Sequence, residues 1–126
     1  MTEPRIENAR ITSTMLGIED HGILTCFIHL LGDGWGCGFG GYVLDQWDDA
    51  HKQRVGTAFA ADCILGILAA VGVEKWEDLP GKYVRAKTEG PGGGILAIGH
   101  IVEDRWFNLR AAAQQARARN ALGKLE

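Results

Sequence analysis

The chain has 126 residues, of which 46% are hydrophobic and 23% charged, and its formal net charge at pH 7 is −3. This length is sufficient for a core that needs no disulfide or metal, so we expect a single domain over residues 1–126. No apolar run approaches the ~18 residues of a membrane span. The slight negative charge argues against a protein devoted to nucleic-acid polymers. The N-terminus lacks the apolar stretch of a secretory signal, so we expect no such signal here.

The charge is unevenly distributed along the chain. Residues 105–126 contain one acid, Glu126, and five bases, which are Arg105, Arg110, Arg117, Arg119 and Lys124. This segment therefore has a net charge of +4, and residues 1–104 have −7. A basic C-terminal helix and tail on an acidic body suits a small anionic ligand better than a long polyanion.

Three β-strands are predicted in the first third of the chain. Residues 5–17 are rich in Ile and Thr, and residues 23–31 are almost continuously apolar. The third strand follows a tight turn at residues 32–34 and ends near residue 44, and glycine occupies every even position from 32 to 40. Because strand side chains alternate between faces, this third strand has one bare face and one bulky face, which carries Trp35, Cys37 and Phe39. We expect the bare face to let a helix or a second subunit approach closely, and the three strands to form an antiparallel meander.

The remaining pattern predicts two helices separated by two strands. A polar connection over residues 45–53 leads to a helix over 57–71, with Thr57 as its N-cap and Gly72 at its end. A helical turn is expected at 76–79, strands at 83–88 and 95–102, and a last helix over 108–120. The order β-β-β-α-β-β-α predicts an α+β fold in which an antiparallel sheet packs against the long helix.

Three groups of residues are candidates for binding an anion. In the last helix, Arg110, Gln114 and Arg117 share one face, and their donors suit phosphate oxygens. The alternative is a solvated helix face whose arginines suit the helix dipole.

The second candidate is the start of the long helix, where Arg54, Gly56 and Thr57 lie. Backbone N–H groups and the helix dipole attract anions there, although an ordinary helix start gives the same pattern. The third is an aromatic and basic face made of Tyr83, Arg85, Lys87, Arg105, Trp106 and Phe107. Rings on such a face can stack a base while arginines hold its phosphates, but aromatic residues are more often part of the core.

The sequence offers no pattern typical of a catalytic or metal centre. The four histidines, His21, His29, His51 and His100, form no metal-binding or catalytic motif. Glu19, Asp20 and His21 are adjacent, but such residues in a turn are usually solvated. Cys26, Cys37 and Cys63 lie in apolar patterns without a CxxC spacing, which indicates buried free thiols. We therefore expect a non-enzymatic protein without cofactor or metal.

Six segments of the chain resemble the phage anti-Thoeris sponge family (Thoeris anti-defence protein one). They are residues 11–17 (ITSTMLG), 19–23 (EDHGI), 38–42 (GFGGY), 54–59 (RVGTAF), 71–79 (VGVEKWEDL) and 81–85 (GKYVR). Their order and spacing carry the resemblance as far as residue 107; beyond that residue only the basic character is similar.

The resemblance implies a phage protein that works in the cytoplasm of the infected bacterial host. Members of this family bind and hide, without cleaving, the cyclic ADP-ribose isomer (gcADPR) that TIR-domain enzymes make as an immune signal. They bind it between subunits of a homo-oligomer, for which the resemblance implies a hexamer. Some members also hold cyclic oligonucleotides of a second defence pathway at separate symmetric sites.

Residue by residue, the resemblance assigns Tyr83 to base stacking, and Arg110 and Arg117 to the phosphates. Arg54 and the His21-Gly22 turn resemble the cyclic-oligonucleotide site. Two other functions remain open: a protein-binding inhibitor of a bacterial defence enzyme that uses the glycine face or the acidic body, and a nucleotide hydrolase that uses Glu19, Asp20 and His21.

Overall fold

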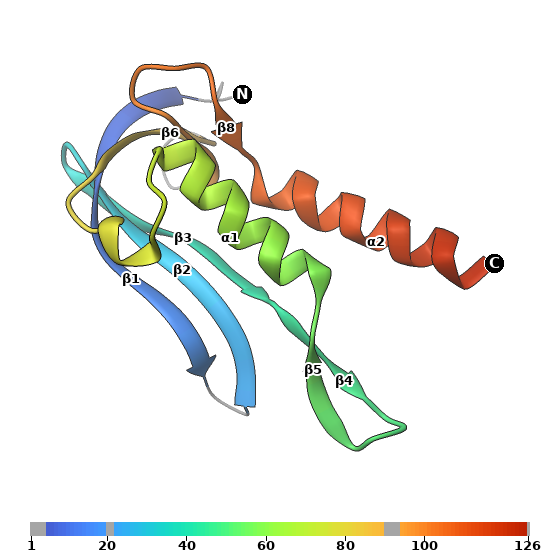
Figure 1. Cartoon of the computed structure of the whole chain (residues 1–126). Coiled ribbons are helices and arrows are strands. Elements are labelled where there is room, and N and C mark those ends of the chain that lie inside the picture. Colours follow the sequence, from blue (N-terminus) through green and yellow to red (C-terminus); the bar gives the residue numbers. More distant parts are fainter. Residues whose placement is uncertain (1–4, 20–21, 90–93, 126) are drawn as a thin grey trace.

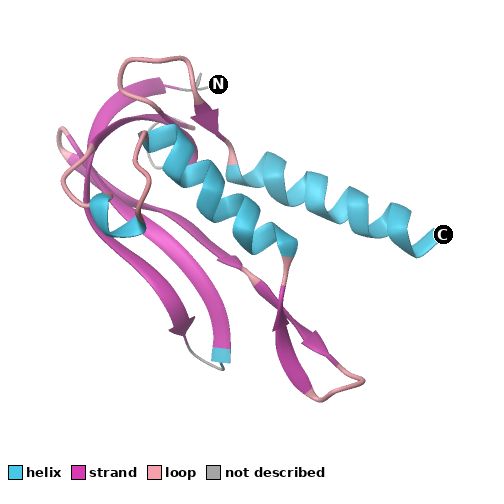
Figure 2. Ribbon diagram, in the orientation of Figure 1, coloured by secondary structure: helices cyan, strands magenta, loops and turns pink. Residues whose placement is uncertain are grey.

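The computed structural model describes residues 5–19, 22–89 and 94–125, with side chains described as far as Arg119. A six-stranded antiparallel sheet has the strand order β3-β2-β1-β6-β7-β8. Its strands are β1 (Arg5–Glu19), β2 (Ile23–Gly32), β3 (Trp35–Val43), β6 (Tyr83–Thr88), β7 (Ile95–Gly99) and β8 (Trp106–Phe107). The other elements are the hairpin β4 (Asp45–Asp48) and β5 (Gln53–Gly56), the helices α1 (Ala58–Val71) and α2 (Leu109–Leu125), and a 3-10 turn, η2 (Trp76–Asp78). The sheet curves around α1, α2 lies beside α1, and the β4–β5 hairpin projects from the body (Figures 1 and 2).

The core lies between the concave face of the sheet and α1. Ile11, Ile28 and Val84 point inward from three strands and are fully buried. Helix α1 meets them with an apolar stripe, of which Ala60, Cys63, Ile67 and Val71 are buried. Phe107 of β8 packs on Gly66 of α1, where an added Cβ would lie 2.4 Å from the ring. A single contiguous core therefore joins the sheet, α1 and the start of α2.

The two caps of α1 form as predicted. The Thr57 hydroxyl accepts a hydrogen bond from the Ala60 N–H at 3.2 Å, and Gly72 ends the helix in the left-handed conformation at φ 90°. An L residue other than glycine is strained at that angle, which explains why the helix stops there.

The glycine strand β3 places its bulky face, not its bare face, toward α1. Phe39 is 2% exposed and pairs in register with buried Ile28, whereas Gly36 and Gly38 face outward and are exposed. The expectation that a helix of this chain covers the bare face is therefore wrong, because only the face with side chains can fill the core. Gly40, at φ 123°, lies at a bulge where an added Cβ would be 2.5 Å from the Cys26 carbonyl oxygen.

The α+β class, the antiparallel meander and the order of the main elements are confirmed. Several boundaries differ from those predicted, and β8 was not predicted. Residues 45–53 are not a plain connection, because 45–48 form β4 and pair with β5. The strand predicted to reach residue 102 ends at Gly99, and α2 continues past residue 120 to Leu125.

Candidate functional site: a cleft between α1, α2 and the β4–β5 hairpin

A cleft of about 620 Å³ lies where the start of α1, the end of β3, the base of the β4–β5 hairpin and α2 meet. Its lining residues are Tyr42, Val43, Asp45 and Gln46, then Gly56, Thr57, Ala58 and Phe59, and on α2 Ala113, Ala116, Arg117 and Arg119. Protein clefts that hold small molecules typically measure ~300–1,000 Å³. This cleft is therefore large enough for a nucleotide-sized ligand within one chain.

Thr57 fixes the floor of the cleft. Besides capping α1, its hydroxyl donates a hydrogen bond to the Leu44 carbonyl oxygen at 2.6 Å, and Leu44 is only 1% exposed. This contact ties the first turn of α1 to the residue that follows β3. The positive end of the helix dipole therefore faces the cleft from a fixed position.

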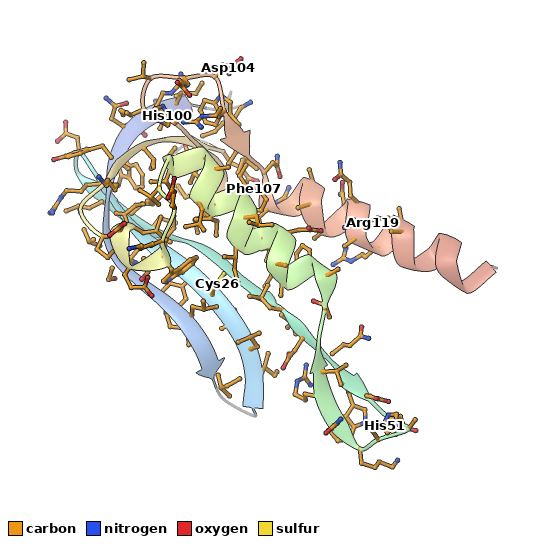
Figure 3. The ribbon with its side chains drawn as sticks, in the orientation of Figure 1. Cys26, His51, His100, Asp104, Phe107 and Arg119 are labelled. Atoms are coloured by element: carbon orange, nitrogen blue, oxygen red, sulfur yellow. The ribbon has the colours of Figure 1, made fainter. Side chains whose placement is uncertain are left out.

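Helix α2 supplies the cationic wall. Arg119 reaches across to α1 and donates to the Asp62 carboxylate at 3.0 Å (Figure 3). Arg117 also lines the cleft and makes no ion pair with any carboxylate among the described residues. Ala113 and Ala116 are small, which leaves room beside the two guanidinium groups. An anion in this cleft thus meets Arg117, which pairs with no carboxylate of the described residues, and Arg119, which is in an exposed ion pair.

Arg54, predicted to bind an anion, pairs with Asp45, the only acidic residue among the described residues that line the cleft. Its guanidinium donates to both Asp45 oxygens, at 2.8 and 2.9 Å. The Asp45 side chain is 8% exposed. Its hydrogen bond with Arg54 lowers the pKa of Asp45 and raises that of Arg54. Both groups therefore remain charged at neutral pH, and Asp45 repels an incoming anion less than an unpaired carboxylate does.

Of the predicted aromatic and basic face, Tyr83, Arg85 and Trp106 lie on the outer side of the sheet, whereas Phe107 packs inward against α1. Arg85 lies with its guanidinium carbon 4.8 Å from the Trp106 ring centroid. It donates to the backbone carbonyls of His100 and Glu103, both at 2.8 Å, and Trp106 donates to Asp104 at 2.9 Å (Figure 3). These hydrogen bonds fix the position of the 100–105 loop. Tyr83, on the same face of β6, is 57% exposed.

Arg110 lies apart from Arg117, although both are on α2. It lines a smaller cavity of about 200 Å³ beside Gly38, Gly40 and Ile95, and it approaches Glu89 at 3.4 Å. The two arginines that the resemblance assigns to one ligand therefore face different cavities within this chain.

The structure brings together Gly56, Thr57 and Arg117, which the sequence placed in two separate sites. Gly22 is exposed, with φ 76°, and is not among the cleft residues. His21 lies outside the described residues, and so does Asp20 of the proposed hydrolase cluster. Sequence reasoning missed Tyr42, Phe59 and Arg119. Arg119 was visible as part of the basic helix, but the two aromatic residues resembled core residues.

His51 and His100 make hydrogen bonds within the fold, and Cys63 is buried. His100 accepts hydrogen bonds at Nδ1 from the Val102 and Glu103 backbone N–H groups, and His51 pairs with Asp48 at the hairpin tip. Burial raises the pKa of the Cys63 thiol to about 12, so it stays protonated at neutral pH. Within residues 5–19, 22–89 and 94–125, no group of three His, Cys, Asp or Glu side chains is placed to hold a metal ion.

None of the helices in the described part of the chain is both long and apolar enough to cross a membrane. Comparisons with protein-family models, with curated proteins and with solved structures found no match to this chain.

Proposed function

We propose that the protein binds and sequesters, without cleaving it, a cyclic ADP-ribose isomer of the kind that TIR-domain enzymes make, and so acts as a phage anti-defence sponge. The observation that carries the proposal is the cleft in which Arg117, Arg119 and the first turn of α1 face one space of nucleotide size. The six segments that resemble the anti-Thoeris sponge family support the same ligand class. The protein acts in the cytoplasm of the infected host, where the signal is made.

The chemistry of the cleft suits a compact diphosphate. Guanidinium groups form charge-assisted hydrogen bonds with phosphate oxygens, and the N-terminus of α1 adds its partial positive charge. Among the described residues that line the cleft, the one acidic residue, Asp45, is neutralised by Arg54. Sequestration requires only binding, and no nucleophile or general base has to be positioned.

The test is an incubation of purified protein with gcADPR, followed by removal of free ligand and heating of the bound fraction. We expect intact gcADPR to be released by heat, in an amount that saturates with protein concentration. Absence of ligand from the bound fraction rejects binding, and release of a linear ADP-ribose product rejects sequestration in favour of hydrolysis.

We also propose that the chain forms a homo-oligomer, a hexamer on the resemblance, and that a cyclic oligonucleotide binds at a second site near Arg54. The exposed side chains of Leu16, Ile18 and Val43 support association, because removing apolar surface from water in an interface lowers the free energy. A ligand at Arg54 has to compete with Asp45 for the guanidinium. Light scattering measures the subunit number, and a monomer at micromolar concentration contradicts the assembly.

The second candidate function is direct inhibition of a bacterial defence enzyme through a protein interface. The exposed Gly36 and Gly38 on edge strand β3, next to exposed Leu31, favour it. Co-purification with a host enzyme, together with no binding of cyclic nucleotides, would support this function over sequestration of a nucleotide.

A further inference from the structure

The cleft has an aromatic part that is separate from its arginines. Tyr42, at the end of β3, and Phe59, in the first turn of α1, both line it and are both half-buried. Their ring centroids are 6.4 Å apart and their planes are tilted by 48°. Two elements distant in the sequence thus place neighbouring rings on one wall, and α2 supplies Arg117 and Arg119 from another.

A nucleotide has two chemically different parts, and the cleft offers a surface for each. Aromatic rings stack bases through their π-faces, whereas guanidinium groups bind phosphate oxygens. Inorganic phosphate or pyrophosphate uses only the second surface. Apolar lining residues such as Ala113 and Ala116 lie on α2 beside the arginines.

We infer that Tyr42 and Phe59 form a base-stacking platform, which makes the cleft selective for nucleotides over base-free phosphates. This inference rests on the proposed function and assigns the base to residues that the sequence analysis did not select. The proposed platform lies in the cleft and not on the outer face of the sheet, where Tyr83 lies on β6. In a single chain, base stacking and phosphate binding then occur in one cavity, with no residue from the outer face.

The experiment compares the affinities of gcADPR and pyrophosphate by calorimetric titration. For the wild-type protein we expect gcADPR to bind at least about tenfold more tightly than pyrophosphate, because stacking of a base commonly contributes that much. Equal affinity for the two ligands overturns the platform, whatever the variants show.

Ring-removing and ring-retaining substitutions then locate the platform. Tyr42→Leu and Phe59→Leu should each weaken gcADPR binding about tenfold and leave pyrophosphate binding unchanged. Tyr42→Phe and Phe59→Tyr keep the rings and should stay within about twofold of wild type for both ligands. Circular dichroism and thermal melting verify that each variant is folded. If a leucine variant does not fold, the wild-type selectivity and the ring-retaining variants still decide the question.

Tyr83→Leu is the contrasting variant. A loss of gcADPR affinity larger for Tyr83→Leu than for the two leucine variants in the cleft overturns the inference and places the stacking ring on the outer face. If the wild type binds gcADPR but the cleft variants bind it unchanged, only the platform fails. If the wild type binds neither ligand, the proposed function fails as well.

Discussion

Arg54 and Arg85 on the strands differ from Arg117 on α2 in what their guanidinium groups contact. Both Arg54 and Arg85 lie on strands. Arg54 forms an ion pair with Asp45, and Arg85 donates hydrogen bonds to carbonyls of the 100–105 loop. Arg117 lies on α2, faces the cleft, and has no carboxylate partner among the described residues. Arginines of the first kind stabilise the fold, and arginines of the second kind remain available to a ligand.

The difference follows from the position of each residue in the fold. A strand residue has cross-strand neighbours that can pair with it, as Arg54 of β5 pairs with Asp45 at the start of β4. Helix α2 has no acidic residue between positions 109 and 125, so Arg117 has no partner on its own helix. Four substitutions test this division, and they follow in order of expected effect.

The largest effect is expected for Arg117→Ala on ligand binding. Loss of a charge-assisted hydrogen bond of about 1.5–3 kcal/mol should weaken gcADPR binding roughly 10- to 100-fold. The melting temperature should not change, because the Arg117 side chain is exposed. Arg10→Ala, which removes an exposed arginine outside the cleft, is the matched control and should bind normally. Equal losses in the two variants would indicate a general charge effect and not a site.

Arg85→Ala should act on stability. It removes two hydrogen bonds to carbonyls and the contact with Trp106, a loss of about 2 kcal/mol in the free energy of unfolding. Denaturant titration measures this loss, and gcADPR affinity of the folded protein should be unchanged. Reduced affinity without reduced stability would move Arg85 into the group of ligand-binding arginines.

Asp45→Asn should show how the Arg54 pair depends on pH. The lowered pKa of Asp45 means that its ion pair stabilises the wild type at neutral pH, and this contribution is lost in acid, as the pH falls through that lowered pKa. The variant lacks the contribution throughout. The stability difference between the two proteins should therefore be constant from pH 7 to about 5 and should shrink in acid. A difference that persists unchanged in strong acid contradicts this assignment.

The smallest effect is expected for the exposed Arg119–Asp62 pair. Asp62→Ala should change stability by about 0.5 kcal/mol or less, because exposed pairs contribute little. It should strengthen gcADPR binding about two- to threefold, since Arg119 no longer has an acidic partner. Asp49→Ala removes a more exposed pair, with Lys52 at the hairpin tip, and should leave binding unchanged. Weaker binding in Asp62→Ala would show that the pair positions Arg119 for the ligand.

Local chemistry made much of the fold predictable from the sequence. Thr57 and Gly72 marked the ends of α1, and the alternation of Val84 and Ala86 with Tyr83, Arg85 and Lys87 identified β6 and its buried face. The hairpin at 45–56 was not predicted, because its strands are short, polar and exposed, with Trp47 54% exposed. Short strands of this kind have no hydrophobic alternation to reveal them.

The candidate site was less predictable, because it depends on contacts between distant residues. Gly56, Thr57 and Arg117 were selected for separate reasons, and only the packing of α2 beside α1 places them in one cleft. Arg54 could not be recognised as an internal partner until β4 paired with β5. Tyr42 and Phe59 looked like core residues because the position of α2, which opens a cavity at their rings, is not encoded locally.

The most direct test of the central claim is a calorimetric titration of the wild-type protein with gcADPR, followed by analysis of the ligand released on heating. We predict saturable binding in the cleft, weakened roughly 10- to 100-fold in Arg117→Ala and retained in Arg10→Ala, with gcADPR recovered intact. Absence of binding, binding indifferent to Arg117, or recovery of a cleaved product would contradict the account.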